Sequence, residues 1–139
     1  MRLLKSILLI LLIFFSLTGC NEQQATLDGK AVKSISVAKV GDSMQEIHKP
    51  HVIYYQKNEK ELKAFIEAIH KAKKINGVVD VAVPDYLLTL TFEDQSVSKY
   101  TLSIGPDNGS IMNENETNTL YKLPSFVIKD LNTYVKSKK

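Results

Sequence analysis

Hydrophobic and polar positions along the chain repeat with two periods. Alternation with period 2, rich in β-branched and aromatic residues, is typical of strands with one buried face. It is imperfect in "AVKSISVAKV", short in "HVIYYQK", and clear in "YLLTLTF" and "VSKYTLSIG". The pattern predicts strands over 31–40, 51–57, 86–92 and 97–105, with short strands at 110–113 and 119–123 completing a meander.

The helical period appears in two segments. In "NEKELKAFIEAIHKAKK", Asn58 with Glu61 three residues later matches a capping box, and Asn76-Gly77 ends the helix. Acids fill the first turn and Lys71, Lys73 and Lys74 the last, as the helix dipole favours. Its apolar face comprises Leu62, Phe65, Ile66, Ile69 and Ala72; a second helix starting at Pro124 has the face Val127, Ile128, Leu131, Tyr134 and Val135.

The order of these elements predicts the fold class. Two strands, a helix, three or four antiparallel strands and a final helix favour an α+β fold, in which both helices cover one face of an antiparallel meander. The loops "GDSMQEIHKP" and "PDNG" separate the strands. The expected sheet core is Tyr86, Leu88, Leu90, Phe92, Tyr100, Leu102, Ile104 and Ile111.

The N-terminus follows neither pattern. Arg2 and Lys5 precede the apolar run Ile7–Leu17, which rises only about 16 Å as a helix. A bilayer core of about 30 Å requires roughly 20 residues. A positive start, a short apolar run and small residues at its end are typical of a cleaved secretory signal peptide.

The end of this run adds an anchor. Leu17-Thr18-Gly19-Cys20 resembles the bacterial lipobox, and Cys20 is the single cysteine of the chain. The resemblance implies a diacylglyceryl group on the Cys20 thiol and cleavage between Gly19 and Cys20. Two acyl chains hold a protein stably at a membrane, whereas one does so only marginally. We therefore expect a signal peptide at 1–19, an acylated cysteine with a polar tether at 20–31, and one extracytoplasmic domain at 32–139.

Charge and size exclude some functions. Removing Arg2 and Lys5 from the 18 basic residues leaves 16, against 15 acidic residues. A mature chain so close to neutrality has no field to attract nucleic acid. The domain is long enough for its own core, and we find no internal repeat or second domain boundary.

Together these segments resemble a known group of proteins. The lipobox, the helix "ELKAFIEAIHKAKK", the run "GVVDVAVPDYLLTLTF" and the late stretch "GSIMNENETNTLYKLP" are similar to small, uncharacterised lipoproteins of Bacillus and related Firmicutes, the YhfM-like group. The resemblance covers most of residues 30–135. None of these segments is a catalytic motif, so it implies a family and an envelope type but no activity.

Candidate contact residues concentrate late in the chain. The segment "DNGSIMNENETN" is rich in oxygen ligands but does not match an EF-hand loop, so we expect a polar loop rather than a calcium site. Loops on a rigid sheet commonly carry recognition. The predicted contact surface is Asp107, Asn108, Asn113, Glu114, Asn115, Glu116 and Tyr121; Tyr54 and Tyr55 are weaker candidates, with core packing as the alternative.

Histidines raise a metal hypothesis that the sequence supports poorly. His48 and His51, with Asp42 and Glu46 upstream, supply nitrogen and oxygen donors. Zinc sites usually have three or four ligands at defined spacings, and Pro50 argues against a helix that aligns both rings. We expect a solvated loop there. His70 is expected on a helix surface.

Acidic residues raise a catalytic hypothesis. Asp80, Asp85, Glu93 and Asp94 could supply paired carboxylates, which require two groups facing one cleft. The alternatives are a turn residue for Asp85 and a hairpin tip for Glu93 and Asp94.

The leading hypothesis is a non-catalytic lipoprotein, without a cofactor other than the lipid on Cys20. It would present a binding domain at the outer face of the cytoplasmic membrane and contact the bilayer and either an envelope protein or a small ligand. The alternatives are a carboxylate-based envelope enzyme and a structural or inhibitory module acting on a membrane partner.

Overall fold

The computed structural model describes residues 24–77, 80 and 82–138. The predicted signal peptide, the Gly19–Cys20 cleavage site and the acylated Cys20 lie outside these residues. Within them, no helix is long and apolar enough to cross a membrane.

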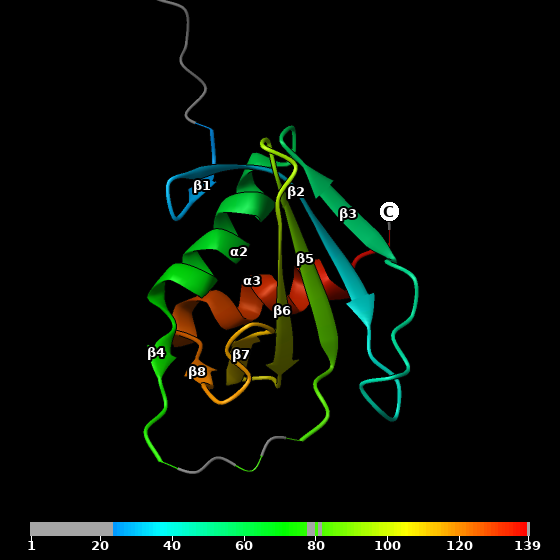
Figure 1. Ribbon diagram of the computed structural model, residues 1–139, viewed down its shortest axis with the longest axis vertical. Coiled ribbons are helices and arrows are strands. Elements are labelled where there is room, and N and C mark those ends of the chain that lie inside the picture. Colours follow the sequence, from blue (N-terminus) through cyan, green and yellow to red (C-terminus); the bar gives the residue numbers. More distant parts are fainter. Residues whose placement is uncertain (1–23, 78–79, 81, 139) are drawn as a thin grey trace, which may run out of the picture.

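Strands dominate the order of elements, with one helix in the middle and one at the end (Figure 1). The elements are β1 (Thr26–Leu27), β2 (Lys30–Lys39), β3 (Val52–Tyr55), α2 (Glu59–Lys71), β4 (Lys73–Lys74), β5 (Tyr86–Phe92), β6 (Val97–Ile104), β7 (Gly109–Asn113), β8 (Tyr121–Lys122) and α3 (Ser125–Lys136).

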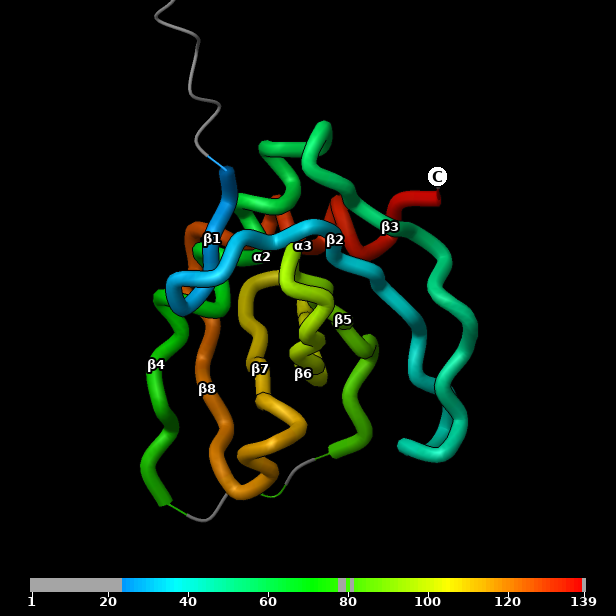
Figure 2. The backbone as a smooth tube through the Cα atoms, turned by 45° about the horizontal axis from the view of Figure 1, so that its top comes forward, coloured from blue at the N-terminus to red at the C-terminus, as the bar shows by residue number. Residues whose placement is uncertain are grey.

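The strands of the described residues form one antiparallel sheet of eight strands. Its order is β1-β2-β5-β6-β7-β8-β4, and β3 pairs with β2 beside this path. Figure 2 shows β4, β8, β7 and β6 side by side across the sheet. β5 to β8 form the predicted meander, and both helices contribute to the same core as the sheet. The α+β fold class is confirmed.

Alternation along the strands places the core as the sequence predicts. The four expected side chains of β5 are buried, and Tyr100, Leu102 and Ile111 join them from β6 and β7, while Ile104 is half-buried. In β2, Ile35 and Val37 face the core, and Val32 is also fully buried. A register shift between Val32 and Ser34 turns Val32 inward and explains the imperfect alternation of this strand.

Both helices pack through their predicted faces. In α2, Leu62 and Phe65 are buried and Ile66 and Ile69 are half-buried; Ala68, which was not predicted, is also buried. In α3, Val127, Ile128, Leu131 and Val135 are buried and Tyr134 is half-buried. α2 contacts α3 as well as β1, β2 and β3.

The predicted ends of α2 are partly wrong. Asn58 is the N-cap residue, but its side chain makes no capping bond, because Asn58 Oδ1 accepts from Tyr55 N at 3.0 Å. The capping box with Glu61 therefore does not form. The helix also ends at Lys71, and Lys73 and Lys74 form β4 opposite β8 instead of a last helical turn. Pairing with a distant strand overrides local helix propensity there.

The fold begins earlier in the chain than the expected start of the domain at residue 32. β1 pairs with the first residues of β2, and Leu27 is buried in the core. Asp28 and Gly29 form the two-residue connection, both with positive φ (51° and 76°), as in a type I′ hairpin turn. Part of the expected tether is therefore a strand of the sheet.

Two side chains, one just before β3 and one within it, hold the C-terminal end of α3. The last carbonyls of a helix lack partners within the helix. His51 Nε2 lies 2.7 Å from the Val135 carbonyl, and the Tyr54 hydroxyl donates to the Tyr134 carbonyl at 2.8 Å. Because a carbonyl can only accept, Nε2 carries the proton. The Tyr54 ring also packs on Phe65, with ring centres 5.8 Å apart.

Replacing Tyr54 with Phe tests this contact. The variant keeps the ring but loses the hydroxyl that satisfies the Tyr134 carbonyl, so we expect a loss of about 1–2 kcal/mol in the free energy of unfolding. Urea denaturation measures it. Tyr55→Phe is the matched control, because Tyr55 is 48% exposed and should be neutral. Equal stability of both variants would contradict this role of Tyr54.

Alkaline pH should weaken the fold. Burial raises the pKa of Tyr54, Tyr86 and Tyr100 above that of an ordinary tyrosine. Above about pH 10 the unfolded chain releases these protons while the folded chain retains them, so stability falls as pH rises. Urea denaturation across this range should show a shallower fall for Tyr86→Phe than for the parent chain. Identical pH slopes would contradict the expectation.

Candidate functional site

A cleft opens where the two ends of the curled sheet approach α2. It encloses about 250 Å³ between the β1–β2 turn, the C-terminal end of α2 and strands β6 to β8. Three other grooves on the described part of the molecule are more open to solvent. The floor is apolar, formed by Leu27, Ile69, Ala72 and Ile111; the polar groups are Asp28, His70, Tyr100, Asn113, Glu116 and Tyr121.

The β1–β2 turn brings Asp28 to the rim of the cleft. Asp-Gly is a preferred sequence for a type I′ turn because both positions require positive φ. Burial of Leu27 fixes the strand that leads into the turn, so the exposed Asp28 lies at a defined edge of the cleft.

Tyr100 forms the inner wall. It lies in the middle of β6 and is only 7% exposed. Asn113 of β7 is its direct cross-strand partner, and the Asn113 side chain hydrogen-bonds with the Tyr100 side chain. Burial is the main reason why the pKa of Tyr100 is raised, and the negative charges of Asp28 and Glu116 raise it further. The hydroxyl therefore stays protonated at neutral pH.

Glu116 and Tyr121 also border the cleft, from the loop before β8 and from β8 itself. The Tyr121 hydroxyl donates to Glu116 Oε2 at 3.3 Å. Two backbone bonds shape the loop that carries Glu116: Glu114 N donates to Lys99 O at 3.0 Å, and Glu116 N donates to Asn113 O at 2.9 Å. Desolvation and the Glu116 charge raise the pKa of Tyr121. The local field is therefore negative at both tyrosines.

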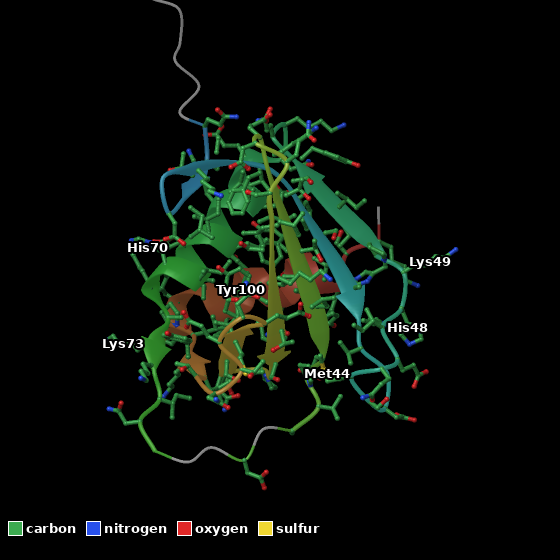
Figure 3. The ribbon with its side chains drawn as sticks, viewed as in Figure 1. Met44, His48, Lys49, His70, Lys73 and Tyr100 are labelled. Atoms are coloured by element: carbon green, nitrogen blue, oxygen red, sulfur yellow. The ribbon has the colours of Figure 1, made fainter. Side chains whose placement is uncertain are left out.

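His70 stands at the edge of the cleft. It is exposed on the last turn of α2, as predicted, and also borders the wider groove along β1. Figure 3 shows His70 on one side of the molecule and His48 and Lys49 on the other, with Tyr100 between them.

The structure divides the predicted contact surface. Asn113, Glu116 and Tyr121 line the cleft, and Glu114 and Asn115 lie in the adjoining loop without lining it. Asp107 and Asn108 lie in the turn at the other end of β7. The five residues of β7 separate the two groups by about 17 Å. The sequence pattern did not indicate Asp28 or Tyr100 as contact residues. The Asp28-Gly29 pair, which is typical of a tight turn, is the feature that could have pointed to Asp28.

The two candidate tyrosines of β3 face opposite ways. Tyr54 is 1% exposed and belongs to the core, as the alternative interpretation held. Tyr55 is exposed on the outer face of the sheet. Neither lines the cleft.

The two histidines of the metal hypothesis have different surroundings. His48 is exposed, with Nε2 3.9 Å from Glu46 Oε1. His51 turns its ring toward the end of α3. Asp42 is joined to Glu46 through its backbone N–H, which donates to Glu46 Oε2 at 3.2 Å. Among the described residues, no three His, Cys, Asp or Glu side chains gather closely enough to hold a metal ion.

The candidate carboxylates do not converge. Asp85 and Glu93 flank opposite ends of β5. Asp85 Oδ2 accepts a hydrogen bond from Ile104 N at 2.8 Å. Glu93 accepts one from the side chain of Gln56. Asp80 is exposed. Asp94 accepts a hydrogen bond from Ser96, and its Oδ2 lies 3.2 Å from Lys30 Nζ. The hydrogen bonds from Ser96 are the main reason why the pKa of Asp94 is lowered to about 2. These groups do not form the paired site that the hypothesis requires.

Comparison with known proteins identifies a family. The model of the family described as YhfM protein matches residues 28–139. The match covers both helices and β2 to β8, and it begins at Asp28 on the rim of the cleft. The searches of curated proteins and of solved structures gave no match.

Replacing Glu116 with Gln tests the field inside the cleft. Loss of the charge should lower the pKa of Tyr121 and, by a smaller amount, that of Tyr100, because Glu116 raises both. NMR titration of tyrosine ring carbons measures each value. Glu114→Gln, in the same loop but outside the cleft, is the control. Unchanged tyrosine pKa values in Glu116→Gln would contradict the described arrangement.

Proposed function

The chain belongs to the YhfM protein family, and we propose that it is a membrane-anchored lipoprotein that presents a small, non-catalytic binding domain outside the cytoplasmic membrane. The observation that carries the binding role is the cleft between β1, α2 and β6–β8. Its lining combines apolar side chains with a larger number of polar ones, and ligand sites use apolar surface for contact and polar groups for orientation.

The anchor rests on the sequence. Leu17-Thr18-Gly19-Cys20 resembles a lipobox and follows a short apolar run. Acylated Cys20 would tie the domain to the bilayer through at least two chains. The seven residues from Cys20 to Leu27 reach at most about 25 Å when fully extended. Since Leu27 lies in the floor of the cleft, this anchor would keep the cleft close to the membrane surface.

The chemistry of the cleft favours recognition over catalysis. Tyr100 and Tyr121 have raised pKa values, so both hydroxyls remain protonated hydrogen-bonding groups near neutral pH. A general base works best with a pKa near the working pH. His70 and the carboxylates of Asp28 and Glu116 border the same cleft, and together with these hydroxyls they can orient a ligand on the apolar floor.

Replacing Cys20 with Ala tests the anchor. The variant lacks the thiol that would carry the lipid, so we expect it to leave the membrane fraction and to lose incorporation of labelled fatty acid. Cell fractionation and intact-mass measurement report both effects. Gln24→Ala is the control, since it changes the chain after the anchor and leaves the lipobox intact.

The anchoring proposal would be contradicted if Cys20→Ala associated with the membrane as strongly as the parent chain and the parent chain carried no lipid. Loss of association by both variants would show that the segment following Cys20 matters in its own right and would contradict the role given to Cys20 alone.

A further inference from the structure

We propose that the cleft binds the ammonium group of a small organic amine, with the alkyl part of the ligand on the apolar floor. This inference rests on the proposed binding function and names the class of ligand. It is carried by the charges, rings and apolar side chains that meet at one place.

Two carboxylates, Asp28 and Glu116, border the cleft together with His70. Asp28 and Glu116 come from opposite ends of the sheet and border the same cavity. Among the described residues, neither takes part in an ion pair; the partner of Glu116 is the neutral Tyr121 hydroxyl. A bound cation would complete this arrangement, because opposite charges within a few ångströms attract.

Two of the neighbouring lysines are engaged elsewhere, while Lys74 lies opposite Tyr121 in the pairing of β4 with β8. Lys30 follows the Asp28 turn closely, but its Nζ bonds to Asp94 and Ser96 at 3.2 and 3.1 Å. Lys71, at the end of α2, pairs with Glu67 at 2.8 Å and lies over the Phe126 ring. The cleft therefore keeps its negative groups free of these two side chains.

Aromatic rings supply a second attraction for an ammonium group. Tyr100 and Tyr121 both line the cavity. The face of a tyrosine ring attracts a cation, and its hydroxyl oxygen accepts from an N–H group. Both carboxylates also act on the Tyr100 hydroxyl, which shows that their fields overlap inside the cleft.

The apolar floor favours an alkylammonium ion over a bare metal ion. Leu27, Ile69 and Ile111 offer no ligand to a metal but can cover methylene groups. A cavity of about 250 Å³ is smaller than the usual site for a drug-sized molecule, so it suits a short amine.

The test uses the full chain, labelled with ¹⁵N and kept in detergent micelles. The probes are n-butylammonium, butyrate and butyramide, which share a short alkyl chain and differ in charge. We expect butylammonium alone to shift the amide signals of the Asp28 turn, the end of α2 and the 113–121 segment. Its dissociation constant should be about 1–10 mM, as for other ligands of this size.

Charge-removing variants locate the site. Asp28→Asn keeps a residue that type I′ turns favour, and Glu116→Gln keeps the side-chain length. Each should weaken butylammonium binding about twofold to fivefold, as for the loss of one exposed charge contact. Glu114→Gln, outside the cleft, should leave the affinity unchanged. Equal weakening in all three variants would point to a general charge effect and overturn the assignment.

The remaining outcomes separate this inference from the proposed function. Binding of butyrate or butyramide in the cleft, as tightly as butylammonium, would overturn the ammonium preference and leave the binding function standing. Absence of shifts with all three probes would overturn the ammonium inference and also count against the cleft as a small-ligand site.

Discussion

The structure depends on covering one apolar face of a wide antiparallel sheet with the two short helices α2 and α3. Seven neighbouring strands span about 29 Å across the sheet at ordinary strand spacing, whereas two packed helices cover a width of about 20 Å. A flat sheet of this width would leave apolar side chains in water. The sheet curls instead, and its end strands β1 and β4 lie next to the helix layer, β1 in contact with α2 and β4 directly after it. The cleft is the space left where these ends meet α2.

The same constraint explains which parts of the fold were predictable. Side-chain periodicity reports local burial, so the strands β5 and β6 and the faces of both helices followed from the sequence alone. β1 and β4 did not, because each has two residues and exists through pairing with a distant strand. Lys73 and Lys74 even continue a helical pattern. Tertiary pairing outweighed local preference there.

The candidate site was predictable only in part for a related reason. Asn113, Glu116 and Tyr121 are close in sequence and stand out as a polar segment beside a strand. Asp28 and Tyr100 join them only through the curl of the sheet and the register of β6 with β7. Asp107 and Asn108 show the opposite case. They are close in sequence to Asn113, but the length of β7 separates them from it. A site assembled from distant segments needs the fold before it can be recognised.

We propose that the chain, anchored through Cys20, uses this cleft as its binding face. The most direct measurement places a photoreactive amino acid at position 114, beside the cleft, or at position 130 on the exposed side of α3, and illuminates intact cells. Mass spectrometry of the recovered chain then identifies adducts. We expect a discrete adduct from position 114 only, and we expect it to be lost when Cys20 is replaced. Equal adducts from both positions, or an adduct from position 130 alone, would contradict it.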